Sequence, residues 1–167
     1  MRHLKNGKLT VSKTTLYETL QSENMYRELI TSLNDECEFN APAAFFEILA
    51  VEEALDIKLP DELKALLKES NGISYDYGTG LVWSTEQIKS ANLEFRNTPD
   101  FRDLYMPFDC LLFFGDLGNG DQFAYSILNS EIRRKDIFEW NHEDDSRTWA
   151  ASNLYRYIEK MLKGDNI

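Results

Sequence analysis

The spacing of the apolar residues changes after Asn71-Gly72 and again near Thr148, and this limits the folds open to the chain. Before the first change, apolar side chains recur every three or four residues, as on a helix with one buried face. From "ISYDY" onward they form short runs broken by glycine, the pattern of strands joined by tight turns. Helical spacing then returns. Helices, then strands, then a helix indicate an α+β fold.

The segment "DIKLPDELKALLKESNG" carries the clearest helix signals. Pro60 suits the first helical position, and the two acidic residues after it suit the positive end of the helix dipole. Asn71-Gly72 predicts the end of this helix, because glycine accepts a left-handed cap. Its apolar stripe consists of Leu63, Leu66 and Leu67. Similar spacing predicts helices within Thr15–Leu33 and over Pro42–Leu55.

The middle of the chain predicts a series of short strands. "ISYDY" and "LVW" flank "GTG", which predicts a hairpin. The stretch "LLFFGDLGNGDQFAYSI", Leu111–Ile127, predicts two strands around its glycines. Cys110 opens the most apolar run, so we expect it to be buried and the strand after it to be central. "IFEW" predicts one more strand.

Two further helices are predicted beside these strands. Ser84 and the glutamine three residues later have the spacing of a capping box, which opens a helix to about Phe95. "RNTPDFRDLYMPFD" then predicts a loop with two prolines. The last helix is predicted over Thr148–Lys163, with Asp145 or Ser146 as its cap.

The glycine-rich loop Gly115–Asp121 raises the question of a ligand site. A phosphate-binding loop needs Lys and Ser or Thr after its last glycine, whereas Asp and Gln follow Gly120. Asp116, Asn119 and Asp121 could offer oxygen atoms to calcium, but not in the register of an EF-hand. We therefore interpret the loop as a turn between strands, and we expect no metal and no cofactor.

Few residues suggest catalysis. The two histidines are His3, in the polar N-terminal stretch, and His142, within the acidic "NHEDDSR". A pair of Cys110 and His142 is conceivable, but an apolar strand disfavours a thiolate. The chain contains no G-x-S-x-G, H-E-x-x-H or C-x-x-C motif. We therefore expect no catalytic residues and no enzymatic activity.

The charge is distributed unevenly. The chain has 29 acidic and 18 basic residues, a net charge of −11. Residues 1–13 hold four basic residues and no acidic one, so we expect a basic, flexible arm there and a net charge of −15 on residues 14–167. Such a body repels nucleic acid and anionic membranes and attracts basic proteins. Two separated cysteines and no visible signal peptide favour the cytoplasm.

Three motifs occur in a characteristic order. The first is "LDIKLPDELKALLKESNGISY", with Leu59-Pro60, a short amphipathic helix and Asn71-Gly72. The second is "MPFDCLLFFGDLGNGDQFAYSI", and the third is "IFEWNHEDD" followed by a helix. Together they resemble the SUKH superfamily, which includes the yeast regulator of cell-wall glucan synthesis. The similarity covers about Ala44–Leu162 and implies one domain over residues 14–167.

The resemblance implies a curved antiparallel sheet, of about four to six strands, with N-terminal helices and a C-terminal helix packed around it. It also implies an immunity protein that binds and neutralises a toxin encoded beside it, often a nuclease. Members of the family are not known as enzymes. Yeast-type members are regulatory scaffolds, so a regulatory module with a partner other than a toxin is the alternative.

The residues expected to contact a basic toxin are acidic and aromatic side chains of the predicted turns and strands. The carboxylates would face the basic active site of a nuclease, which binds phosphate. The aromatic side chains would serve as anchors. The expected charged contacts are Asp116, Asp121, Glu139, Glu143, Asp144 and Asp145, and the expected anchors are Tyr75, Tyr77 and Trp140.

Overall fold

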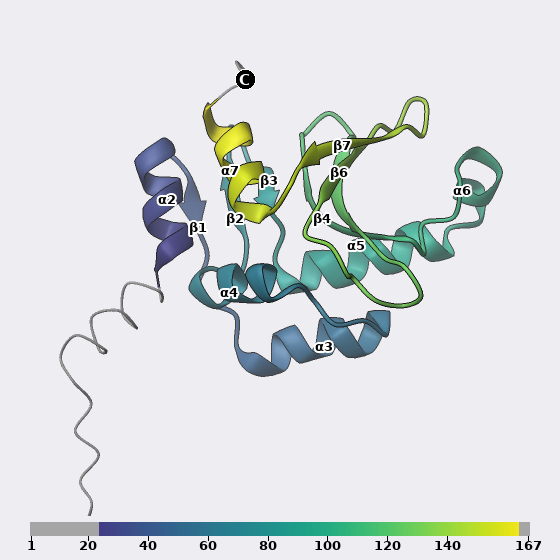
Figure 1. Cartoon of the computed structure of the whole chain (residues 1–167), viewed down its shortest axis with the longest axis horizontal. Helices are drawn as coiled ribbons and strands as arrows, with labels where there is room; N and C mark the ends of the chain where they lie inside the picture. Colours follow the sequence, from purple (N-terminus) through teal and green to yellow (C-terminus); the bar gives the residue numbers. More distant parts are fainter. Residues whose placement is uncertain (1–23, 164–167) are drawn as a thin grey trace, which may run out of the picture.

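The computed structural model describes residues 24–163 and confirms the α+β class (Figure 1). The predicted arm at residues 1–13 and the start of the first predicted helix lie outside the described residues, and the single domain over residues 14–167 stays a prediction. In chain order the elements are α2 (Met25–Leu33), β1 (Glu38–Phe39), α3 (Phe45–Leu55), α4 (Asp61–Glu69), β2 (Ile73–Tyr75), β3 (Thr79–Val82), α5 (Thr85–Asn97), α6 (Pro99–Leu104), β4 (Leu111–Asp116), β5 (Gln122–Ser126), β6 (Ile137–Trp140), β7 (Arg147–Ala151) and α7 (Leu154–Lys163).

The strands of the described residues form two antiparallel sheets, ordered β1-β2-β3 and β4-β5-β6-β7. The sheets meet where the Trp83 N–H donates to the Phe114 carbonyl at 2.7 Å. Gly115 permits this approach, because a Cβ there would lie 2.6 Å from the Leu81 carbonyl oxygen. The four-stranded sheet is curved: Arg147 Nη1, at the start of its last strand, lies 3.1 Å from the sulfur of Cys110, just before its first strand.

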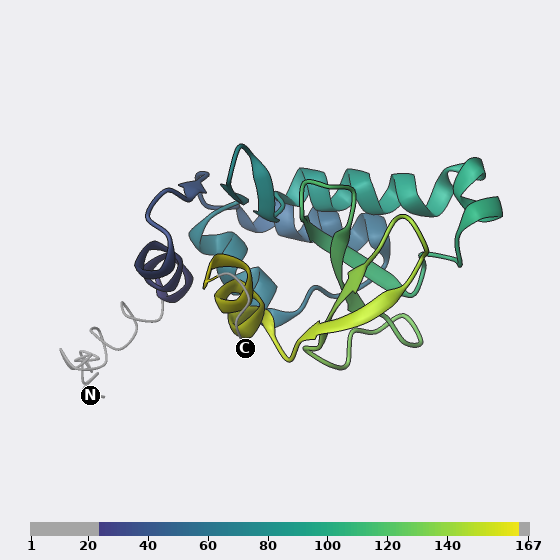
Figure 2. The ribbon, with the colours of Figure 1, turned by 90° about the horizontal axis from the view of Figure 1, so that it is seen from above.

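The helices cover the sheets from different sides. The helices α3 and α5 pack together, and α5 packs on β4, while α7 packs on β7 and α2. Figure 2 shows α3 and α5 on one side of the molecule and β7 toward the opposite side. The predicted capping box opens α5: Ser84 Oγ accepts from the Gln87 N–H, and Gln87 Oε1 accepts from the Ser84 N–H at 2.9 Å. None of the helices between residues 24 and 163 has the length and apolar character needed to cross a bilayer.

An aromatic cluster lies between the curved sheet, α5 and α6. Trp140 is 3% exposed, and its ring meets that of Phe108 edge-on at 5.2 Å. Edge-to-face pairs at such distances are favourable beyond the apolar area that they bury. The cluster consists of Phe95, Phe101, Tyr105, Phe108, Phe113 and Trp140.

The prediction was wrong at the C-terminal side. Residues 147–151 form the strand β7, not the start of the last helix, because they pair with β6. The helix α7 begins at Leu154, and Asn153 caps it: Asn153 Oδ1 accepts from the Arg156 N–H at 2.9 Å. Neither Asp145 nor Ser146, which precede β7, is that cap.

Five smaller differences concern burial, the position of one strand and short elements. Cys110 is exposed rather than buried. The strand β4 is buried along its length but lies at the end of its sheet, where β3 covers it. The predicted proline loop contains the short helix α6, and β1 had no clear sequence signal. The helix α3 begins at Phe45, three residues after Pro42.

One buried side chain joins α5 to β4. Asn92 is 1% exposed, and its Nδ2 donates to the Phe113 carbonyl at 2.8 Å while its Oδ1 accepts from the Phe113 N–H at 2.9 Å. Nδ2 also donates to the Ile88 carbonyl one turn earlier in the helix. These bonds satisfy backbone groups of Phe113 that water cannot reach.

We predict that Asn92→Ala lowers the free energy of unfolding by about 3 kcal/mol, because it leaves buried donor and acceptor groups of Phe113 unpaired. Urea denaturation monitored by circular dichroism measures the change. Asn97→Ala is the matched control, since Asn97 makes the same bond to the carbonyl four residues earlier but is exposed. We expect it to change stability by less than about 0.5 kcal/mol. Equal losses in the two variants would contradict the role assigned to Asn92.

Candidate functional site

Three turns lie close together at one end of the strands, and we call them the turn row. They are the β2–β3 turn (residues 76–78), the β4–β5 turn (residues 117–121) and the β6–β7 turn (residues 141–146). The last two are in contact: a Cβ on Gly120, which has a φ of 107°, would lie 2.9 Å from the His142 ring. Glycine is therefore required where the second turn passes under the third.

Asp116 joins the β4–β5 turn to β3 and to the residue that follows it, Trp83. Its Oδ2 accepts from Trp83 Nε1 at 2.6 Å and from the Gly80 N–H at 3.3 Å. Its Oδ1 accepts from the Gly118 N–H at 2.8 Å. Both oxygens therefore bind donors of the chain itself, and Asp116 fixes the β4–β5 turn against β3.

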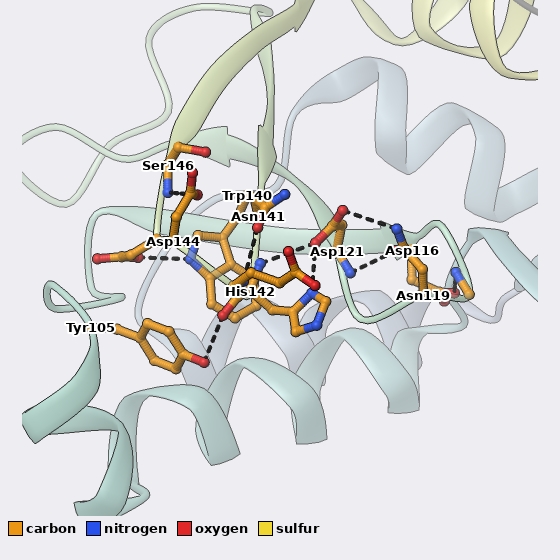
Figure 3. Close-up of polar contacts among 12 residues, drawn as sticks. Tyr105, Asp116, Asn119, Asp121, Trp140, Asn141, His142, Asp144 and Ser146 are labelled. Carbon is orange, nitrogen blue, oxygen red and sulfur yellow. Dashed lines mark hydrogen bonds and ion pairs between the residues drawn. The ribbon is translucent and has the colours of Figure 1, made fainter.

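Asp121 joins the second turn to the third (Figure 3). Its side chain accepts from the backbone N–H of His142 at 3.0 Å, from His142 Nδ1 at 2.7 Å and from Asn119 Nδ2 at 3.0 Å. The residue is only 5% exposed. Burial would raise the pKa of Asp121, but the hydrogen bonds from His142 and Asn119 outweigh burial and lower it.

Asp145 organises the third turn. Its Oδ1 accepts from Trp140 Nε1 at 2.7 Å and from Arg147 Nη2 at 3.3 Å, and its Oδ2 accepts from the Met106 N–H at 2.7 Å. Arg147 also donates to the carbonyls of Met106 and Pro107. Burial raises the pKa of Asp145, but these donors bring it below its usual value.

Glu143 and Asp144 are the exposed carboxylates of the same turn. The turn backbone is fixed by its own side chains: Asn141 Oδ1 accepts from the Glu143 N–H at 2.8 Å, and Asp144 Oδ1 accepts from the Ser146 N–H at 2.9 Å. Tyr105 adds a bond from its hydroxyl to the His142 carbonyl at 2.9 Å (Figure 3). The two carboxylates therefore face solvent from a well-defined backbone.

The remaining predicted contacts differ in exposure. Tyr77 is fully exposed at the tip of the β2–β3 turn, whereas Tyr75 and Glu139 are half-buried. Burial, followed by the nearby carboxylates of Asp76 and Asp116, raises the pKa of Tyr75. Trp140 lies in the aromatic cluster, where its side chain is not accessible to a partner.

The turn row and the residues beside it offer few side chains for catalysis or metal binding. His142 Nδ1 is bound to Asp121, and the sulfur of Cys110 contacts Arg147 and lies 3.6 Å from the Pro107 carbonyl oxygen. In the β4–β5 turn, the oxygens that could have bound calcium accept hydrogen bonds from the chain. Among residues 24–163, no group of three His, Cys, Asp or Glu side chains could hold a metal ion.

Sequence reasoning missed the residues that hold the turns. Arg147 contacts the third turn from the end of the predicted acidic loop, and Tyr105 and Met106 contact it from the predicted proline loop. Asp76, exposed beside Tyr77, was not among the expected contacts. A signal for the rigid turn was present, because "NHEDDS" twice places an Asn or Asp two residues before the backbone group that it binds.

The family comparison agrees with this fold. The model of the SMI1-KNR4 cell-wall family, SUKH_6, matches residues 47–158, more than half of the 167-residue chain. The chain belongs to the SUKH superfamily. The match runs from α3 into α7 and includes all three turns of the turn row. A comparison with curated proteins returned no match.

Membership of the SUKH superfamily confirms the resemblance found in the sequence. It indicates the function of the chain only at the level of the family. The SUKH family fits a protein of the toxin-immunity type and suggests binding to another protein. Its members are known as immunity or regulatory domains rather than as enzymes.

We predict that Asp145→Asn lowers the free energy of unfolding by about 2–3 kcal/mol at neutral pH, because an amide cannot accept hydrogen bonds through both of its groups. The loss should shrink at low pH. An aspartate whose pKa is lowered in the folded state stabilises the protein above its unfolded-state pKa of about 3.9, and this contribution is lost as pH falls through the folded value.

Urea denaturation between neutral pH and pH of about 2.5 measures both effects. Glu143→Gln is the control, because it removes an exposed carboxylate from the same turn. We expect Glu143→Gln to keep the stability and pH dependence of the unmodified chain. A difference between Asp145→Asn and the unmodified chain that stays constant over the whole pH range would contradict the ionised role of Asp145.

Proposed function

We propose that this protein is a cytoplasmic immunity protein that binds a cognate polymorphic or contact-dependent toxin and blocks its active site. The observation that carries the proposal is the β6–β7 turn, where Glu143 and Asp144 are exposed on a backbone fixed by internal hydrogen bonds. Because little conformational freedom remains to be lost in the turn backbone, more of the interaction energy is available for binding. Membership of the SUKH superfamily supports the immunity role.

The charge of the turn row suits a basic partner. Its residues include no Lys or Arg, and its charged side chains are Asp76, Asp121, Glu143, Asp144 and Asp145, with Asp116 beside them. Charges of one sign concentrated on one surface speed the encounter with an oppositely charged protein, toward about 10⁸ M⁻¹ s⁻¹ at low salt. The net charge of −11 extends this field beyond the turns.

The proposed toxin is a bacterial nuclease. A nuclease must bind phosphate, so its active site carries basic side chains that an acidic turn can cover. This inhibition needs no catalysis and no cofactor. The immunity protein itself would avoid nucleic acid and membrane surfaces because of its acidic charge.

The expected contact residues divide into two groups in this proposal. Glu143, Asp144 and Tyr77 would touch the toxin, because they are exposed, and Tyr75 and Glu139 would border the contact. A second group would hold the turns in position without touching the toxin. It consists of Asp116, Asp121, Trp140 and Asp145.

A second candidate function is a regulatory module whose partner is not a toxin. The observation that favours it is the description of the matching family, which refers to the cell wall. The same exposed turn would then bind a basic regulatory partner. Copurification with a partner that has no toxic activity when it is expressed alone would support this alternative.

We predict that coexpression of this protein relieves killing by the toxin encoded beside its gene, and that the two copurify. Glu143→Lys with Asp144→Lys should weaken binding by at least about 100-fold, since two attractive contacts become repulsive and the bond from the Ser146 N–H to Asp144 is lost. Titration calorimetry with a catalytically inactive toxin measures the affinity. Added salt should weaken the unmodified complex more than the variant complex.

The matched control is Glu28→Lys with Glu53→Lys, which makes the same change of charge at exposed positions on α2 and α3, outside the turn row. We expect this control to keep most of the affinity. Equal losses in the two double variants would mean that only the net charge matters, which would remove the turn from the proposal. Full killing without copurification of the unmodified protein would refute the immunity role itself.

A further inference from the structure

The sheets have four outer edges, and three of them are closed or short. The outer edges of β3 and β4 face each other through the bond from the Trp83 N–H to the Phe114 carbonyl. The strand β1 forms an edge of only two residues. The strand β7 has five residues, and within the described part of the chain it pairs with β6 alone. It lies on the side of the molecule away from α3 and α5 (Figure 2).

The register shows which backbone groups of β7 point outward. The Asn141 N–H donates to the Ser146 carbonyl at 2.9 Å, so this pair is hydrogen-bonded. Bonded pairs alternate with non-bonded pairs in an antiparallel ladder, which makes Glu139 and Thr148 the next bonded pair. The N–H and carbonyl groups of Arg147 and Trp149 therefore point away from β6.

The outer edge of β7 lacks most of the features that prevent an exposed strand from pairing with another chain. It contains no proline and no lysine, and the guanidinium group of Arg147 is bound to carbonyls of the chain itself. A register shift near Ala150 limits the regular part to the first residues of the strand. Trp149 is 57% exposed at the edge, beside a hollow of about 390 Å³ that α7 borders.

The edge is also self-complementary. The outward groups belong to two residues on either side of Thr148, so a two-fold axis at Thr148 places Arg147 of one copy opposite Trp149 of the other. Both pairs can then exchange N–H to carbonyl hydrogen bonds. Residues 148–152 carry no charge, in a chain of net charge −11. The carboxylate of Asp136 lies beside this edge, where it accepts from Trp149 Nε1 at 3.0 Å, and the two-fold axis places Arg147 of the other copy, not an acidic residue, opposite Trp149.

We propose that the outer edge of β7 binds a second copy of this chain, which joins two four-stranded sheets into one antiparallel sheet across a two-fold axis at Thr148. The occupant must be an extended strand, because only a strand offers donors and acceptors at the spacing that the edge presents. Repulsion between two acidic chains opposes the pairing, so association is weak at low salt and stronger at high salt. This inference does not depend on the toxin-binding proposal.

Sedimentation equilibrium of the full chain, up to millimolar concentration and at low and high salt, measures the association. We expect the mass to rise from one chain to two with concentration, and the midpoint to move to lower concentration with added salt. Trp149→Pro removes an N–H group that points outward and makes no bond to β6. This variant should stay monomeric. Trp149→Phe keeps that N–H and should still associate. Circular dichroism verifies that both variants fold.

A disulfide tests the register. Thr148 would face Thr148 of the second copy with Cα atoms about 4.5 Å apart, within the range of about 4.4–6.8 Å that a disulfide spans. Mild oxidation of Thr148→Cys should give a covalent dimer, and Ser90→Cys, at an exposed hydroxyl on α5, should not. Peptide mapping separates this link from links through the exposed Cys110. A monomer under all conditions, or equal crosslinking of the two cysteine variants, would overturn the proposal.

Discussion

The hydrogen bond from the Trp140 indole to Asp145 constrains both the core and the surface of this protein. Trp140 fills the aromatic cluster inside the curved sheet, and its N–H must find an acceptor there because water is excluded. Asp145 supplies that acceptor, but a partly buried carboxylate needs donors of its own. Arg147 and the Met106 backbone provide them. The shape of the β6–β7 turn therefore follows from the requirements of one buried ring.

This arrangement separates the acidic residues of the turn row by what they contact. Asp116, Asp121 and Asp145 accept hydrogen bonds from the chain itself, and their charge stabilises the turns. Glu143 and Asp144 belong to the same turn but are exposed, and Asp144 uses one oxygen to accept from the Ser146 N–H. Acidic residues that are adjacent in the sequence therefore have different roles, and the net charge of the chain does not distinguish these roles. The buried group positions the exposed group, so a change at Asp145 can alter binding without contact with a partner.

Local signals predicted part of this fold and could not predict the rest. The capping box at Ser84 and the leucine stripe of α4 are contained within single elements, and both were confirmed. The strand β7 was predicted as helix, because its residues show no clear alternation and pairing with β6 decides their conformation. The role of Asp145 depends on Met106, which lies 39 residues away in the chain. Spacing within one segment cannot reveal such contacts, and acidic residues in a loop look alike in sequence.

The two proposed interfaces use adjacent parts of the chain without excluding each other. The β6–β7 turn ends at Ser146, and the proposed two-fold axis passes through Thr148. In an antiparallel pair the two strands run away from the axis in opposite directions, so the acidic turns of the two copies would lie roughly 20 Å apart. That separation exceeds the Debye length of about 8 Å at physiological ionic strength, so their mutual repulsion is largely screened. Each turn would remain open to a basic partner, because pairing uses the uncharged backbone edge and leaves the carboxylates in solvent.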